Sequence, residues 1–320
     1  MSPQNTANSQ PDFAFPQQVI KDADKMLENA LEEGDGIAVV DALIRSGLAQ
    51  TAISPDSLPS VITKIEAVNA KETDEVTKAL LDLLLANIYG EYYQDNKYNF
   101  DARPELANPG EDITLWSGKE FKEKIIALYQ HALTYAPVLK KTRISDYSSI
   151  IICDKTTAIF YPTLFDFVSR QAIDGISSLS DETMRVLSPL YFYNFRLTLP
   201  NVMAKPSQEA ILIADSWVES NEGAPRIAAI LSRYELIENY VVEDSEEEED
   251  NAVTPISRLY EDNKENPYAV EILLNEDFYN LTIEQKKDVY GKLKEFAAAN
   301  PTYFRINMVK NALAYVTAAC

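Results

Sequence analysis

The sequence predicts an all-α protein, and three observations support this prediction. Only 9 of the 320 residues are glycine, which leaves few glycine turns for a β-sandwich. Alanine, leucine, glutamate and lysine, which favour helices, are abundant. Hydrophobic residues make up 46% of the chain, which excludes wholesale disorder. Because the chain is longer than a usual single core, we expect either two domains or one elongated stack of repeats. The predicted fold is a tetratricopeptide-like helical solenoid or stacked antiparallel helix pairs.

The first four helices follow from apolar spacing and end signals. After a polar leader at 1–15, which we expect to be disordered, Pro16 suits the first turn of a helix. Short connections between the helices predict antiparallel neighbours. The helices are expected at 16–34, at 36–50, from 54–55 onward, and from a cap at Thr73 or Asp74.

The fourth helix carries two adjacent apolar stripes. A helix that is apolar over so much of its circumference is normally packed on two sides, as an inner helix of a stack would be. The central helix of an ordinary bundle is the alternative. The stripes are Leu80, Leu84, Ile88 and Tyr92, and beside them Leu81, Leu85, Tyr89 and Tyr93.

A long polar insert, DARPELANPGEDITLW at 101–116, separates this helix from the next, which is expected at 117–136. The apolar run at 146–154 fits either a strand or a buried helical turn, because periodicity cannot separate them. An acidic linker or loop at 243–251 is expected to divide a helical repeat-like domain at 16–242 from a continuing stack at 252–320. The later helices are expected from Pro162 and at 185–195, 208–220, 225–242, 253–263, 268–276, 282–299 and 301–320.

The composition restricts the partners. With 29 basic and 50 acidic residues the net charge is −21, which repels nucleic acid and anionic lipid surfaces. No apolar run approaches the roughly 18 to 20 residues of a membrane span. The only cysteines, Cys153 and Cys320, are far apart, so neither a disulfide framework nor a metal cluster is indicated, and no cofactor is expected.

The chain ends give two further expectations. The leader lacks the basic and apolar regions of a signal peptide, so an exported protein would have lost its signal here. The final residues, NALAYVTAAC, stop within a helical pattern without a cap. We therefore interpret the chain as a fragment of something longer, truncated at its C-terminus.

The helix pair around the insert matches part of a tetratricopeptide repeat. Leu85, Ala86 and Tyr89 fit its first helix, and Tyr129, Ala132 and Pro137 fit its second. Tyr89 and Tyr129 are 40 positions apart, however, where the repeat needs about 13. The residue types that pack the two helices therefore match the repeat, but the spacing between the helices does not.

Three blocks of sequence also resemble a known family. LLANIYGEYYQDN, EDITLWSGKEFKEKIIALYQHAL and YPTLFDFVSRQAID are similar to the N-terminal helical region of the large alpha-2-macroglobulin-like proteins of Bacteroidetes, best over 61–176. The resemblance implies an exported periplasmic or outer-membrane-associated protein of protease-trap or envelope-protection type. Members carry a bait region and some a Cys-x-x-Gln thioester, but Cys153 is followed by DKT and Cys320 by nothing. No trapping chemistry can therefore be placed here.

Few residues suggest chemistry. His131 has no evident oriented partner or nucleophile, so we interpret it as exposed or incidental. Cys153 is interpreted as a small buried hydrophobe rather than a nucleophile. The acidic tract at 243–250 lacks the ligand spacing of a calcium loop, so a solvated linker is favoured. Asp82, Glu91 and Asp112 are carboxylates that a helical glycosidase would need, although 50 acidic residues make such candidates uninformative.

Aromatic side chains are the remaining candidates. Tyr191 to Phe195 would put rings all round a helix, with core packing favoured over a ligand groove. In and beside the insert, Tyr98, Phe100 and Trp116 either pin this segment to the stack or form a partner surface. We expect a non-catalytic interaction module that binds a protein partner or adjoining domains of its own longer chain. The alternatives are an independent binding protein for a peptide or glycan and, less favoured, a helical glycoside hydrolase.

Overall fold

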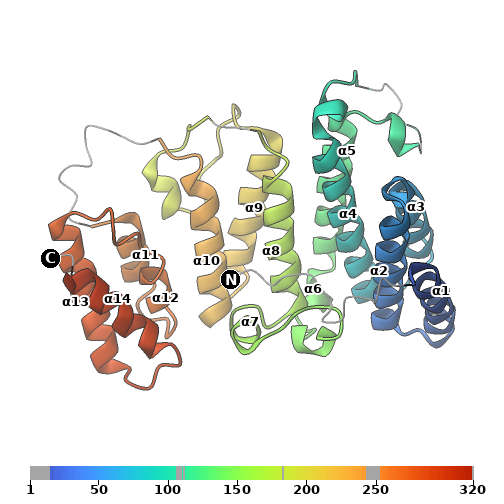
Figure 1. The fold of residues 1–320 in the computed structure, drawn as a ribbon. Helices are drawn as coiled ribbons and strands as arrows, with labels where there is room; N and C mark the ends of the chain where they lie inside the picture. Colours follow the sequence, from blue (N-terminus) through green and yellow to red (C-terminus); the bar gives the residue numbers. More distant parts are fainter. Residues whose placement is uncertain (1–14, 106–109, 111, 182–183, 243–252, 319–320) are drawn as a thin grey trace. The chain divides into compact units, whose positions relative to one another are not determined.

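A computed structural model describes residues 15–105, 110, 112–181, 184–242 and 253–318. Within these ranges the chain forms fourteen α-helices and no strand, which confirms the all-α prediction (Figure 1). The chain divides into two compact units. Unit 1 comprises Met1–Asp181 with Ala204–Ile213, and unit 2 comprises Glu182–Met203 with Ala214–Cys320. Most of the predicted leader and all of the predicted acidic linker at 243–251 lie outside the described residues.

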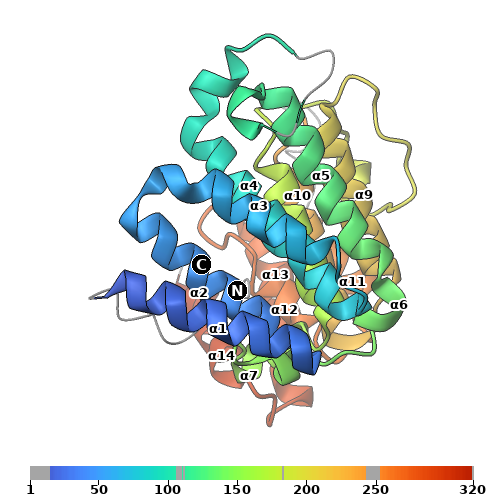
Figure 2. The ribbon, with the colours of Figure 1, turned by 90° about the vertical axis from the view of Figure 1, so that its right-hand side faces the viewer.

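Unit 1 begins with a helical hairpin of α1 (Pro16–Glu33) and α2 (Gly36–Ile53), which lie side by side (Figure 2). Pro16 starts α1 as predicted, and Gly34 ends it with a φ of 69° that glycine adopts without strain. Asp35 then caps α2, since its side chain accepts a hydrogen bond from the Ala38 N–H.

Polar contacts join this hairpin to α3 (Leu58–Asn69). The Lys64 ammonium donates to Ser46 Oγ at 3.0 Å and pairs with Asp24, so one residue from each helix contributes. By length and composition α2 could span a membrane, contrary to the expectation that no such run exists. The core helix of a globular protein meets the same criterion, and α2 contacts α1, α3 and α4.

The two-sided packing predicted for the fourth helix is confirmed. Helix α4 (Glu75–Asp101), capped by Asp74, contacts α2 and α3 as well as α5 (Gly118–Thr134) and α8 (Leu164–Ser177). Ala86 and Ala132 are fully buried. Figure 1 shows α4 and α5 running side by side, with the described part of the insert at one end of the pair.

Close packing also joins α5 to α8. A Cβ atom on Gly175 would lie 2.0 Å from the Tyr129 hydroxyl, so only glycine fits there. That hydroxyl donates to Asn87 Oδ1 at 2.6 Å and so links three helices. The ambiguous segment at 146–154 is neither a strand nor an α-helical turn. The segment between α5 and α8 contains α6 (Ala136–Leu139), the 3₁₀ turn η3 (Ile144–Tyr147) and α7 (Lys155–Phe160).

The boundary between the units falls inside α9 (Lys205–Glu219), after Ile213. In unit 2 the predicted helix at 185–195 is wrong, because only a 3₁₀ turn, η4 (Pro189–Phe192), forms there. The remaining helices of unit 2 are α10 (Gly223–Glu238), α11 (Pro255–Asp262), α12 (Val270–Leu273), α13 (Ile283–Ala299) and α14 (Ile306–Ala318).

The C-terminal part of unit 2 has its own apolar core. Thr282, the first residue of the helix predicted at 282–299, caps α13 in a capping box with Gln285. Glu271 of α12 is buried and satisfied, since Tyr303 donates to it at 2.8 Å and Arg305 forms an ion pair with it. The core is built from Val270, Leu273, Val289, Leu293, Phe296, Val309 and Ala312.

Candidate functional site

The three aromatic residues predicted in and beside the insert have different environments. Phe100 is 2% exposed and stacks on Phe121, with ring centroids 4.5 Å apart. Trp116 is half-buried and lies parallel to Tyr89 at 5.9 Å. Tyr98, on the last turn of α4, is 89% exposed. Phe100 and Trp116 therefore pack against neighbouring rings, and Tyr98 is the most exposed of the three.

Polar contacts fix the described part of the insert as well. Arg103 donates to the carbonyls of Thr114 and Trp116, at 2.6 and 2.8 Å, and lies 4.6 Å from the Phe100 ring centroid. The Trp116 indole N–H donates to the Gly110 carbonyl at 2.9 Å. The insert is thus anchored through both its side chains and its backbone.

His131 has a partner that the sequence did not reveal. Its Nδ1 lies 2.6 Å from Asp82 Oδ2, and the buried Asp82 carboxylate also accepts from Asn69 at 2.7 Å. The Asp82 carboxylate thereby connects α3, α4 and α5. Within the described ranges no serine, threonine or cysteine side chain bonds to the imidazole. If His131 acted as a base, the group that it activates would have to belong to a substrate.

The carboxylates proposed for a hydrolase do not form an evident pair. Asp82 and Glu91 are nine residues apart on α4, which places them on opposite faces and about 13 Å apart along the axis. Glycosidase carboxyl groups lie about 5 to 9.5 Å apart. Burial and the charge of Asp95 raise the pKa of Glu91. Asp112 accepts from the backbone and side chain of Thr114, at 3.0 and 2.5 Å.

Cys153 and Ser257 are two other side chains that could act as nucleophiles, and the environment of each disfavours that role. Cys153 is half-buried, and burial followed by the charge of Asp154 raises its pKa, which disfavours the reactive thiolate. Ser257 accepts from Lys292 at 2.6 Å, an arrangement that suggests a serine–lysine pair. Ser257 is 0% exposed, however, and its hydroxyl donates to the Asp288 carboxylate that also pairs with Lys292 at 2.7 Å, so the three groups form a buried structural network.

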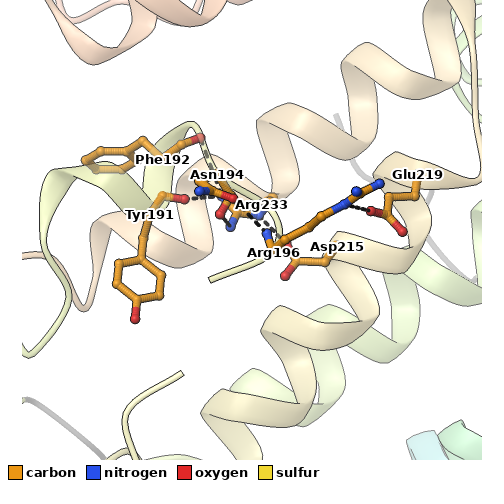
Figure 3. Close-up of polar contacts among 7 residues, drawn as sticks. All are labelled: Tyr191, Phe192, Asn194, Arg196, Asp215, Glu219 and Arg233. Carbon is orange, nitrogen blue, oxygen red and sulfur yellow. Dashed lines mark hydrogen bonds and ion pairs between the residues drawn. The ribbon is translucent and has the colours of Figure 1, made fainter. Parts of the chain in front are cut away.

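The aromatic loop, residues 188–196 of unit 2, is organised by a buried arginine. Arg233 of α10 is 1% exposed and pairs with Asp215 of α9. Its guanidinium donates to the carbonyls of Tyr191 and Phe192 and, at 3.3 Å, of Asn194. Figure 3 shows these carbonyls directed at the guanidinium. One cation thus satisfies carbonyl groups that a helix would have bonded to its own N–H groups.

The electrostatics of this buried pair have two opposing contributions. Burial raises the pKa of the Asp215 carboxyl above its ordinary value, and the Arg233 guanidinium offsets part of that rise. The sequence contained a signal for Arg233, because Ile230, Arg233 and Ile237 share one face of α10 at spacings of three and four. A basic residue within an apolar stripe indicates a buried partner.

An open hollow of about 500 Å³ lies beside this loop. Arg196 from the loop pairs with Glu219 of α9 at 3.3 Å (Figure 3), and Arg226 of α10 donates to the Val218 carbonyl at 2.7 Å. Neither arginine was predicted from the sequence to belong to a site. The hollow is lined by Tyr193, Asn194, Phe195, Arg196, Glu219 and Arg226.

No group of three or more potential metal ligands occurs among the residues that the structure describes, and the acidic tract at 243–250 lies outside them. Comparison of the sequence and structure with family models, curated proteins and solved structures gave no match. The resemblance to alpha-2-macroglobulin-like proteins accordingly rests on the three sequence blocks alone.

Proposed function

We propose that this protein is a non-catalytic helical interaction module that binds a protein partner through the end of the α4–α5 pair. One observation carries the proposal: Tyr98 is 89% exposed although the helix turn that bears it is held by an aromatic core. Exposed aromatic side chains on rigid supports are frequent anchors of protein interfaces. Leu115 in the insert is also 63% exposed and adds apolar surface.

The rigidity of this support matters for binding. Phe121 lies at the centre of the aromatic core, with the rings of Phe100, Trp116 and Tyr92 at 4.5, 5.3 and 5.7 Å from it. The packed base orders the backbone of this turn, so little backbone entropy is lost when a partner covers Tyr98. The base therefore favours recognition of a folded or extended protein surface.

The net charge and the sequence resemblance indicate the kind of partner and the cellular location. A net charge of −21 favours neutral or basic protein surfaces over nucleic acid or anionic membranes. The partner is either a separate protein or an adjoining domain of the same longer polypeptide. In this proposal the helices form a solenoid-like stack at the N-terminus of a larger exported alpha-2-macroglobulin-like protein in the periplasm or at the outer membrane.

The genomic context tests the family part of the proposal. The nucleotide sequence that follows the codon for Cys320 should encode β-rich sandwich domains, and the sequence before Met1 should encode an export signal. A stop codon directly after Cys320 would contradict membership of the family while leaving the interaction proposal open to a binding test.

A peptide library tests the binding part. Random displayed peptides panned on the immobilised whole protein should give binders whose affinity falls about tenfold or more with Tyr98→Ser. Tyr279→Ser is the matched control, because Tyr279 is 78% exposed but lies in unit 2. Equal loss with both variants, or binders that depend on neither, would contradict the assignment. Retention of glycans in an array, independent of Tyr98, would favour the glycan-binding alternative instead.

A further inference from the structure

The hollow beside the aromatic loop is a second candidate site, located in unit 2 and independent of Tyr98. Its volume of about 500 Å³ falls within the range of roughly 300 to 1,000 Å³ that is usual for small-ligand sites. Its lining combines two aromatic rings, Tyr193 and Phe195, with two guanidinium groups, Arg196 and Arg226. Two cations in one hollow are notable in a protein with a net charge of −21.

The Arg226 guanidinium is held in place, but not all of its N–H donors are hydrogen-bonded. One Nη1 bond to the Val218 carbonyl, at 2.7 Å, ties its guanidinium to the last turns of α9. A guanidinium carries five N–H donors. Within the described residues this is the one hydrogen bond that the Arg226 guanidinium makes, so donors remain for a ligand. The bond to Val218 keeps them at the edge of the hollow.

Arg196 has a partner that a ligand can replace. Its Nε lies 3.3 Å from Glu219 Oε1, and the two side chains are 86% and 52% exposed. Ion pairs this exposed contribute little to stability. A ligand carboxylate that binds both Arg196 and Arg226 would therefore gain more than it displaces, because paired N–H donors match the two oxygens of a carboxylate.

The aromatic wall is rigid. Phe195 lies over the Arg233 guanidinium at 4.6 Å, and Tyr193 lies under the Arg258 guanidinium at 4.1 Å. The loop backbone is held by Arg233 through the carbonyls of Tyr191 and Asn194. Rings braced in this way provide a preorganised surface for an apolar side chain next to the ligand's charged group.

The charge of the ligand is also constrained. Glu219 is part of the lining and would repel a multiply charged group such as a phosphate dianion. The negative net charge of the whole protein also repels a multiply charged anion. A singly charged carboxylate meets less repulsion and still matches the arginine forks.

We propose that this hollow binds a peptide carboxylate, with Arg196 and Arg226 holding the charge and Tyr193 and Phe195 contacting an adjacent apolar side chain. The carboxylate comes either from the C-terminus of a polypeptide or from an acidic residue within one. Two probes distinguish these sources: N-acetylphenylalanine carries a terminal carboxylate, and N-acetylphenylalanylglutamate amide carries one on a side chain. N-acetylphenylalanine amide and the matching glutamine peptide are the neutral controls.

Ligand-observed saturation-transfer NMR on the whole protein measures the binding. At least one acidic probe should bind, its neutral control should bind about tenfold more weakly or not at all, and Arg196→Gln should weaken the acidic probe by about tenfold. Glu219→Gln should tighten binding, because it removes the competing carboxylate. Arg45→Gln, which removes an arginine ion-paired with Asp41 in unit 1, should change nothing.

The variants separate recognition from folding. Arg226→Gln should also weaken binding, but it removes the bond to Val218, so the exposed pair of Arg196 and Glu219 carries the decisive comparison. The proposal is overturned if neither acidic probe binds, if the neutral controls bind equally, or if inorganic phosphate binds in their place. Tyr98→Ser should leave probe binding intact, so failure of this site and failure of the proposed protein interface are distinguishable.

Discussion

Two aromatic-rich segments that are not α-helical, the insert of unit 1 and the aromatic loop of unit 2, are held by different interactions. In the insert, Trp116 stacks on Tyr89 of α4, and the half-buried Arg103 donates to the carbonyls of Thr114 and Trp116. The loop is held by rings and carbonyl groups on cations, with Arg233 at the centre. Similar composition therefore leads to two kinds of anchor. One is shared between a stacked ring and a half-buried arginine, and the other depends on a single buried arginine.

The two anchors differ in the residues that they make accessible to a partner or ligand. The anchor of the insert leaves neighbouring side chains exposed, as with Tyr98 on the last turn of α4. A buried guanidinium fixes a backbone that in turn places Arg196 and Phe195 around a hollow. We expect the insert to tolerate conservative changes and the aromatic loop to depend sharply on Arg233.

The largest expected effect is that of Arg233→Met. Removing the guanidinium leaves the carboxylate of Asp215 and several loop carbonyls without their donor, and losing one partner of a buried ion pair costs about 3 to 5 kcal/mol. The protein has two tryptophans, one in each unit. In a Trp116→Phe background, urea unfolding followed by the fluorescence of the buried Trp217 measures the change in unit 2.

The double variant Arg233→Met with Asp215→Asn sharpens this prediction. It removes both charges, so it should recover part of the loss of the single variant. If the double variant is as unstable as the sum of the two single variants, the two side chains do not interact in the way the geometry indicates.

Trp116→Ala should have a smaller effect. Trp116 is half-buried, so we expect the free energy of unfolding of unit 1 to fall by about 2 kcal/mol, less than for a fully buried tryptophan. Urea unfolding monitored by circular dichroism gives the size of the change. The Trp217 fluorescence transition should stay where it is, and a shift of that transition by a comparable amount would show that the insert does not act within unit 1 alone.

The pH dependence of unit 2 should show the raised pKa of Asp215. Because the folded state binds this proton more tightly than the unfolded state, its contribution to stability is full at low pH and declines as pH rises through the folded-state pKa. The difference in unfolding free energy between wild type and Asp215→Asn should therefore decrease from about pH 4 upward. A difference that increases over this range would contradict the dominance of burial.

The smallest expected effect on stability is that of Tyr98→Ser. An exposed side chain away from the core should change the unfolding free energy by at most about 0.5 kcal/mol. Thermal melting checks this. A larger loss would mean that Tyr98 belongs to the aromatic core, and its use as a partner-binding residue would need revision.

Much of the fold could be predicted because local signals decide it. Asp74 and Thr282 cap their helices through hydrogen bonds formed within three residues. The aromatic loop could not be predicted in this way, because the donor to its carbonyls lies about 40 residues away on α10. The aromatic run at 185–195 was predicted to be helical, but a guanidinium distant in sequence binds the carbonyls that helical hydrogen bonds would have used.

The candidate sites could be predicted only in part, because they too depend on contacts between residues that are distant in the sequence. The sequence identified Tyr98, Phe100 and Trp116 together, but which ring packs and which is exposed depends on Phe121 and Tyr89 from two other turns. The Asp82 and His131 pair joins residues 49 positions apart, beyond any local pattern.

Amide hydrogen exchange tests the central claim, that each segment depends on its own anchor, most directly. Exchange should be measured by mass spectrometry on wild type, Trp116→Ala and Arg233→Met. Trp116→Ala should accelerate exchange at 112–117 and leave 188–196 unchanged, and Arg233→Met should do the reverse. If either variant loosens both segments equally, or if Arg233→Met leaves 188–196 protected, the account of two independent anchors is contradicted.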